Sequence, residues 1–182
     1  MKATGIVRRI DDLGRVVVPK EIRRTLRIRE GDPLEIFTDR EGEIILKKYS
    51  PIGELGQFAK QYADSLAQTT GHIIAITDKD QFIAVSGPAK KDLITKGISH
   101  ELEEVINERE SIVAAKEDKN FIKIMSEDDG EYTYEVIFPI ISEGDAIGSV
   151  IILTKDTKTK LGEVETKLAS TAAAFLGRQM EQ

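Results

Sequence analysis

The chain has 182 residues, of which 40% are hydrophobic, 32% are charged and none is cysteine. These values are typical of a globular protein with one large or two small domains, and they exclude disulfides, thiolate metal sites and a thiol nucleophile. The sequence has no apolar run of about 18 residues and no apolar signal core, so we expect a cytoplasmic protein without a membrane span.

Charge is distributed unevenly along the chain. The net charge of −6 would by itself argue against a nucleic-acid-binding protein. Residues 1–29, however, hold nine Lys and Arg against three acids, a net charge of +6, whereas residues 30–50 carry −3 and residues 51–182 carry −9. A basic head on an acidic body predicts a DNA-binding domain joined to a domain that stays off DNA.

The first 50 residues predict the order strand, strand, helix, strand, strand. Gly14 can adopt the positive φ needed in the turn of residues 11–15, and residues 39–42 are typical of a hairpin turn. Pro19 favours a helix start, because the first helical residue needs no amide donor. The predicted elements are Ile6–Ile10, Val16–Val18, Lys20–Leu26, Leu34–Thr38 and Glu43–Tyr49.

This N-terminal segment is rich in apolar side chains for its size. Fifty residues bury too little surface to form a convincing core alone, and sharing the apolar groups between two copies would solve the problem. We therefore expect residues 1–50 to be an obligate homodimer. The residues concerned are Ile6, Ile10, Val16, Val17, Val18, Ile22, Leu26, Ile28, Leu34, Ile36, Ile44 and Leu46.

Basic side chains gather on one side of the predicted helix. At roughly 100° per residue, Ile22 and Leu26 fall within about 40° of each other and are expected to face the core. Measured from Ile22, the basic residues lie between about 100° and 200°, on an outward arc. Guanidinium groups suit DNA, since their planar fork binds phosphate or a guanine edge with two hydrogen bonds. The basic residues are Lys20, Arg23, Arg24 and Arg27.

The order of residues in this segment resembles the AbrB family of transition-state regulators. The match covers nearly all of residues 1–50 and fixes many positions across four elements. It rests on residues 5–19 (GIVRRIDDLGRVVVP), 21–26 (EIRRTL), 31–36 (GDPLEI) and 44–49 (IILKKY). The resemblance implies a swapped-hairpin dimer, a β-barrel whose strands interlace between two protomers and which binds double-stranded DNA.

The resemblance also implies site residues and a role. The positions that match DNA-contacting arginines of the family are Arg8, Arg15, Arg23 and Arg24. Together with a second domain, the resemblance implies control of late, forespore sporulation genes, activating some and repressing others. Arg27 departs from close relatives, which often carry glycine or asparagine there, so a left-handed helix end does not follow from the sequence.

Residues 51–55 are expected to be a linker, and residues 56–182 a second domain of the α+β class. Apolar residues at spacings of three and four predict amphipathic helices at Leu55–Leu66 and Leu161–Met180, and Ser99–Glu108 predicts a charged helix. The predicted strands are Ile73–Thr77, Phe82–Ser86, Phe121–Met125, Tyr132–Ile141 and Ala146–Leu153, with a weaker candidate at Ile112–Ala115. This order resembles the GAF fold, an antiparallel sheet flanked by helices, which serves as a sensor of small metabolites in many proteins.

Two uses of the second domain stay open, namely regulation by a small-molecule effector and assembly alone. A pocket between the sheet and its helices would be lined by apolar strand residues, which are also candidates for plain core. The two amphipathic helices are long enough to join dimers into a homotetramer by helix packing. We expect no cofactor and no metal site, since the only histidines are His72 and His100. The pocket candidates are Phe82, Ile83, Phe138, Ile140 and Ile151.

Two other functions compete with transcription regulation. An enzyme would need a nucleophile with a base or a phosphate-binding loop, and the sequence has no cysteine, no glycine-rich loop between strand and helix, and no supported Ser–His pair. An antitoxin with the same N-terminal fold would end in a disordered tail, whereas residues 51–182 show the periodic apolar pattern of a folded domain. We therefore expect a DNA-binding transcription regulator without enzyme activity.

Overall fold

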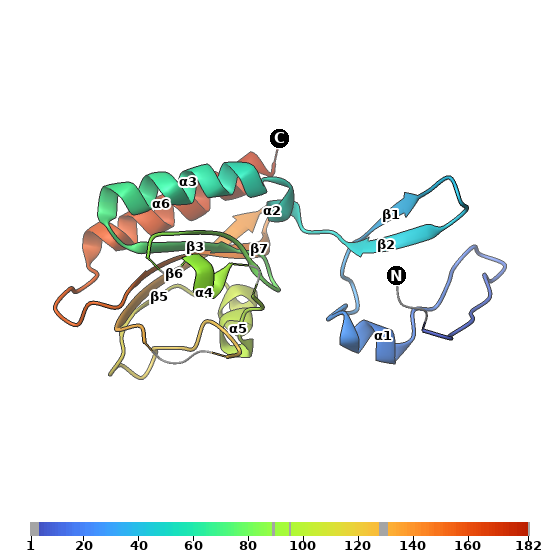
Figure 1. The fold of residues 1–182 in the computed structure, drawn as a ribbon, viewed down its shortest axis with the longest axis horizontal. Coiled ribbons are helices and arrows are strands. Elements are labelled where there is room, and N and C mark those ends of the chain that lie inside the picture. The colour runs from blue at the N-terminus through green and yellow to red at the C-terminus, as the bar shows by residue number, and fades with distance from the viewer. Residues whose placement is uncertain (1–3, 89, 95, 128–130, 182) are drawn as a thin grey trace. The chain divides into compact units, whose positions relative to one another are not determined.

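The computed structural model describes residues 4–88, 90–94, 96–127 and 131–181 of the chain, which is drawn in Figure 1. The chain divides into two compact units, residues 1–49 and residues 50–182, here called the N-terminal unit and the C-terminal unit. No helix among the described residues is long and apolar enough to cross a membrane.

The N-terminal unit contains helix α1 (Lys20–Thr25) and the hairpin of strands β1 (Leu34–Thr38) and β2 (Ile44–Lys48). The strands pair antiparallel with Ile36 opposite Leu46, so the predicted hairpin is confirmed. Pro19 is the N-cap of α1 rather than its first helical residue, with φ −57° and ψ 147°. Its fixed φ still sets the entry into the helix.

The predicted strands at residues 6–10 and 16–18 do not form within this chain. The turn between them does form: the Asp11 N–H donates to the Arg15 carbonyl at 3.0 Å, and the Gly14 N–H donates to the Asp11 carbonyl at 3.1 Å. Gly14 has a φ of +76°, as the turn prediction requires. A strand needs a neighbour to pair with, and the described residues of this one chain provide none for these segments.

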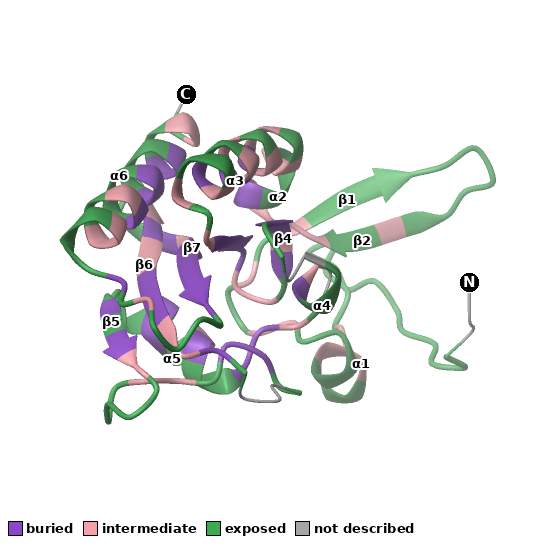
Figure 2. Ribbon diagram, turned by 60° about the vertical axis from the view of Figure 1, so that its left-hand side comes forward, coloured by how far each residue is buried: buried purple, intermediate pink, exposed green. Residues whose placement is uncertain are grey.

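The N-terminal unit has almost no interior of its own. Among its described residues only Pro19 is buried, and in Figure 2 this unit is mainly green. Large apolar side chains are instead open to solvent, including Val7 at 85%, Val17 at 71% and Ile36 at 66% exposure. Leu26, which the helical periodicity predicts to face a core, is 58% exposed because this chain alone supplies no core for it to face.

The C-terminal unit is built on a five-stranded antiparallel sheet in the order β4–β3–β7–β6–β5. The strands are β3 (Ile73–Thr77), β4 (Phe82–Ser86), β5 (Ile112–Ala115), β6 (Tyr134–Ser142) and β7 (Asp145–Thr154). The helices are α2 (Pro51–Glu54), α3 (Gly56–Thr70), α4 (Lys90–Leu93), α5 (His100–Glu108) and α6 (Glu163–Gln179). The α+β class is confirmed, and β3, β4 and β5 have the predicted bounds.

The sheet separates two apolar cores, one on each face. Helices α3 and α6 lie side by side over one face, and α5 packs on the other (Figure 1). Successive strand residues alternate between the faces, so Ile74 and Ile76 join the core under α3 and α6 while Ile73 joins the core under α5. Helix α6 approaches the sheet closely at Gly177, where a Cβ atom would lie 2.0 Å from the Ile141 carbonyl oxygen.

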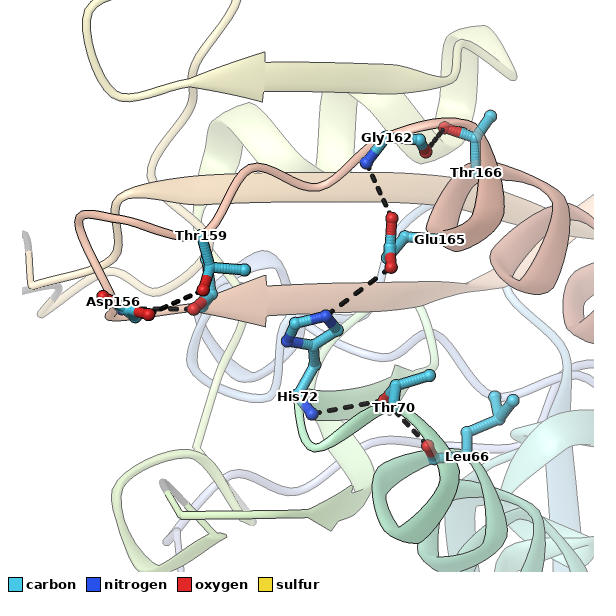
Figure 3. A network of polar contacts seen from close by, with 9 residues as sticks. Leu66, Thr70, His72, Asp156, Thr159, Gly162, Glu165 and Thr166 are labelled. Atoms are coloured by element: carbon cyan, nitrogen blue, oxygen red, sulfur yellow. Dashed lines mark hydrogen bonds and ion pairs between the residues drawn. The ribbon is translucent and has the colours of Figure 1, made fainter.

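A polar network fixes the end of α3 to the start of α6, as Figure 3 shows. The imidazole Nε2 of His72 lies 3.6 Å from the Glu165 carboxylate, which also accepts the Gly162 N–H at 2.7 Å. Burial alone would raise the pKa of Glu165, but the Gly162 hydrogen bond and the nearby His72 outweigh burial and lower this pKa. The carboxylate thus caps α6 and orients it on the sheet.

The predicted strand Phe121–Met125 is wrong. Ile124 and Met125 are buried as the apolar pattern indicates, but the backbone here bonds to the start of α5 instead of joining the sheet. The Ser99 N–H donates to the Ile124 carbonyl at 3.0 Å, and Ile98 forms an isolated bridge with Met125. An apolar run in the sequence indicates that the segment is buried, and a loop packed on a core can be buried as fully as a strand.

The two units are joined without a free spacer. Tyr49 is held to the N-terminal unit, since its N–H donates to the Pro33 carbonyl at 3.0 Å. The next residue, Ser50, is held to the C-terminal unit, since its hydroxyl donates to the Asp78 carboxylate at 2.9 Å and accepts the Gly53 N–H at 3.1 Å. Residues 51–55, expected to be a linker, include helix α2, whose Ile52 is fully buried in the core under α3 and α6.

Candidate nucleic-acid interface

Arg23 and Arg24, in the middle of α1, differ in the exposure and hydrogen bonding of their side chains. Arg24 is exposed, and its guanidinium has no hydrogen bond or ion pair with any described residue. Arg23 is half-buried, and its Nε donates to the Val18 carbonyl at 3.2 Å. Arg23 therefore also fastens the helix to the segment before it, so the expectation that both side chains point freely outward holds for Arg24 alone.

Helix α1 ends in a left-handed turn in spite of its arginine. Arg27 has a φ of +52°, the Ile28 N–H donates to the Arg23 carbonyl at 2.8 Å, and the Arg27 N–H donates to the Arg24 carbonyl at 3.3 Å. This is the Schellman pattern that glycine usually completes. The left-handed conformation is strained for a residue with a Cβ atom, so the helix end is kept at an energetic cost.

A salt bridge joins strand β2 to the segment that follows α1. Lys48 on β2 lies 3.1 Å from the Asp32 carboxylate and donates to the Arg27 carbonyl at 3.0 Å, and Asp32 also accepts the Arg29 N–H at 2.8 Å. Burial would raise the pKa of Asp32, but the Arg29 hydrogen bond and Lys48 outweigh burial and lower this pKa. The hairpin is thereby tied to the end of α1.

The Arg15 side chain is exposed, but its Nε is bonded to an acidic residue of the same turn. Its Nε lies 2.9 Å from an Asp11 carboxylate oxygen, while the Asp11 carboxylate also accepts the N–H groups of Leu13 and Arg15. These bonds, the Arg15 N–H first, lower the pKa of Asp11. Asp11 is not among the site residues predicted from the sequence, although an aspartate at the start of a turn commonly accepts backbone N–H groups in this way.

Arg8 completes the set of candidate arginines. It is exposed, and its only hydrogen bond to a described residue is a long one of 3.5 Å to the Val7 carbonyl. Of the four candidates, Arg8, Arg15, Arg23 and Arg24, only Arg15 has a carboxylate partner in the described part of the chain. The positive charge of the N-terminal unit is therefore largely available to an external anion.

The predicted pocket residues of the C-terminal unit do not lie together. Phe82 and Ile151 belong to the core under α5, whereas Ile83, Phe138 and Ile140 belong to the core under α3 and α6. Neighbouring strand residues point to opposite faces, so these five residues cannot line one cavity. A shallow groove of about 350 Å³ beside α6 includes only Phe138 of the five.

The two amphipathic helices use most of their apolar stripes on their own sheet. Leu66 and Leu176 are buried there. Three aromatic residues of α3 and α6 are not fully buried, and the Phe175 ring lies 5.8 Å from that of Phe58 and 5.6 Å from that of Tyr62. Phe175 is 39% exposed.

Two family models match the chain. Residues 54–181 match the model for the C-terminal domain of stage V sporulation protein T, described as a transcription factor. Residues 7–54 match the model described as antidote-toxin recognition MazE, a bacterial antitoxin.

Relatives and solved structures agree with this division. The chain is 58% identical to stage V sporulation protein T of Bacillus subtilis over 182 residues, all of both chains. It is 67% identical to the transition state regulatory protein AbrB of the same organism over 51 residues, which are 28% of this chain and 52% of AbrB. The GAF domain of an Acinetobacter phosphoenolpyruvate-protein phosphotransferase shares its fold, with a TM-score of 0.57 and 14% identity over 69% of this chain and 81% of that one.

Proposed function

Because the chain belongs to the stage V sporulation protein T family, we propose that it is a DNA-binding transcription regulator of sporulation genes. Double-stranded DNA would be held by Arg8, Arg15, Arg23 and Arg24 of a swapped-hairpin homodimer. The observation that carries the proposal is the uncompensated positive charge of residues 1–29, where three of these four arginines have no carboxylate partner among the described residues. DNA phosphates are the abundant partner for such a surface.

Homodimer formation is supported by the exposed apolar surface of the N-terminal unit. So many exposed large apolar side chains in a unit of this size favour an interface, since leaving them in water is unfavourable. Eleven of the fourteen exposed large hydrophobic residues in the described chain precede residue 50. Sedimentation of a fragment ending at Ser50 tests this part, and a folded monomer would contradict it.

The DNA face is tested with two arginine variants of the full-length protein. Arg24→Ala removes a free guanidinium from α1, and Arg40→Ala removes the same charge from the β1–β2 turn as the matched control. We expect Arg24→Ala to weaken binding by about 1–3 kcal/mol per contact, in each of two protomers, and to make the salt dependence shallower. Binding to a duplex selected by the wild-type protein is measured across a salt series.

The outcome separates a specific face from general attraction. If most of the eight arginines of a dimer contact phosphate, the slope of log K against log salt is expected to be roughly −5 to −7 for the wild type, and about 2 less steep for Arg24→Ala. Arg40→Ala is expected to keep the wild-type slope. Equal losses for the two variants, or no loss for Arg24→Ala with circular dichroism unchanged, would show that the proposed face is wrong.

Tetramer formation would use the aromatic group on the C-terminal unit. Since Leu66 and Leu176 are already buried on the sheet, the proposed contact between two dimers uses aromatic side chains of these helices that are not fully buried, namely Phe58, Tyr62 and Phe175. Sedimentation of Phe175→Ser in the full chain is expected to show dimers where the wild type shows tetramers. A wild type that is strictly dimeric would contradict this part of the proposal.

The family relationship also supports a proposal about the target genes. We include in the proposal that the protein acts on late, forespore genes, activating some and repressing others. Reporter fusions in cells lacking the gene would then change in both directions, and a uniform direction of change would contradict this assignment.

A further inference from the structure

The turn before α1 contains an acidic residue, Asp11, among the arginines proposed to bind DNA. Asp11 lies in sequence between Arg8 and Arg15, and a carboxylate beside the DNA repels phosphate. We propose that Asp11 is a positioning residue for DNA binding, which holds the guanidinium of Arg15 in the orientation that meets the DNA. The inference rests on the proposed function and assigns Asp11 a favourable effect in spite of its charge.

The two carboxylate oxygens of Asp11 have separate partners. One oxygen accepts the N–H groups of Leu13 at 3.0 Å and of Arg15 at 2.8 Å, which closes the turn. The other oxygen accepts the Nε–H of Arg15 at 2.9 Å. The backbone of Asp11 is also paired with that of Arg15, so both ends of the contact belong to one rigid turn. The Arg15 guanidinium is therefore held by a carboxylate whose own position is held by the hydrogen bonds of the turn.

The contact leaves the outer edge of Arg15 available. Only Nε is engaged, the side chain is 68% exposed, and no other described residue binds the guanidinium. The two Nη groups form the fork that can bind a phosphate or a guanine edge. A free arginine must lose its rotamer freedom when it binds, at a cost of roughly 2- to 10-fold in affinity, and an arginine already held loses less.

Charge and positioning make opposite predictions for Asp11. If the carboxylate acted only by repelling phosphate, its removal would tighten binding, by an amount that salt reduces because charges are screened within about 8 Å at physiological ionic strength. If it positions Arg15, its removal weakens binding. The sign of the change decides between the two.

The neighbouring residue provides the matched control. Asp12 is exposed and forms no hydrogen bond or ion pair with any described residue. Asp12→Asn removes the same charge one position away from Asp11, without removing a contact. Asparagine at position 11 can still accept the two backbone N–H groups and keep the turn, but its amide NH₂ cannot accept the Nε–H of Arg15.

The experiment measures binding of the full-length protein to one duplex selected by the wild type from a randomised pool. We expect Asp11→Asn to weaken binding by about 3- to 10-fold, since a dimer presents the contact twice, and Asp12→Asn to bind as tightly as the wild type or more tightly. Thermal unfolding by circular dichroism checks that Asp11→Asn stays folded. Binding of Asp11→Asn that equals or exceeds that of Asp12→Asn would overturn the inference.

A second background separates this inference from the proposed function. In Arg15→Ala, the substitution Asp11→Asn should no longer weaken binding, because the side chain that it positions is gone. The same loss in both backgrounds would assign Asp11 to the turn alone and overturn the inference. If Arg15→Ala itself binds like the wild type, the proposed role of Arg15 fails; if Arg15→Ala weakens binding and Asp11→Asn does not, only the role of Asp11 fails.

Discussion

The two units of this chain satisfy the requirement for a core in opposite ways. The C-terminal unit buries large apolar side chains on both faces of its sheet, including Ile74, Ile76 and Ile151 with no exposed surface. The N-terminal unit buries only Pro19 among its described residues and leaves Ile36, Val7 and Val17 in solvent. Apolar content therefore does not distinguish them; what differs is whether one chain can cover its own apolar residues. Because the first unit needs a second copy to cover its apolar residues, its stability should depend on protein concentration.

The largest expected effect is on the self-contained core. Gly177→Ala places a Cβ atom 2.0 Å from the Ile141 carbonyl oxygen, a distance that only a shift of α6 can relieve. We expect a loss of about 3 kcal/mol in the free energy of unfolding of the C-terminal unit, from overpacking against backbone. Denaturant unfolding followed by circular dichroism measures it, with Ala174→Ser on the exposed side of α6 as control. A loss below that of the control would mean that α6 is not packed as described.

The second effect concerns apolar residues whose exposure in a single chain underestimates how much they stabilise the dimer. Ile36 is 66% exposed and Val113 on β5 is 42% exposed, so a single chain predicts that Ile36→Ala costs less than Val113→Ala. A dimer core reverses the order, and we expect about 2 kcal/mol per protomer for Ile36→Ala and under about 1 kcal/mol for Val113→Ala. Thermal unfolding at several protein concentrations distinguishes them. Two equally mild variants would remove the evidence for a shared core.

The smallest effect is one that both units should share. Arg27 at the end of α1 and Arg109 at the end of α5 have φ values of 52° and 59°, in the left-handed region. Glycine at either position relieves the left-handed strain of the folded state, and this effect is partly offset by the greater conformational entropy of glycine in the unfolded chain. Arg27→Gly and Arg109→Gly should therefore each stabilise the protein by up to about 1 kcal/mol. Melting temperatures measure both, with alanine at each position as the control for lost charge. Destabilisation by glycine would show that the arginine side chains stabilise these ends.

The sequence predicts strands best where their pairing partner lies in the same chain. The bounds of β3, β4 and β5 follow from apolar runs between turn residues, and these strands lie in the sheet of the C-terminal unit. The segment 121–125 shows the same apolar signal but pairs with a loop, which periodicity does not reveal. The strands expected at residues 6–10 and 16–18 need a neighbour that one chain does not contain.

The candidate site was less completely predicted than the fold. Helical periodicity places Arg24 outward, and Arg24 is exposed, but periodicity cannot show that Arg23 bonds to the Val18 carbonyl. The left-handed conformation of Arg27 runs against residue preference and is visible only in the backbone. The pocket candidates failed for a simpler reason, because Phe82 and Ile83 are neighbours on a strand and so point to opposite faces.

The connection at Tyr49 and Ser50 leaves few torsion angles free between the two units. Consecutive residues are tied to different units, one to Pro33 and the other to Asp78, and only a single peptide unit separates the two ties. A linker of many residues has many torsion angles that can change, whereas here a change of orientation requires rotation about ψ of Tyr49 and φ of Ser50, on either side of one planar peptide bond. Residues inserted between Tyr49 and Ser50 are therefore expected to lengthen this connection without removing either hydrogen bond.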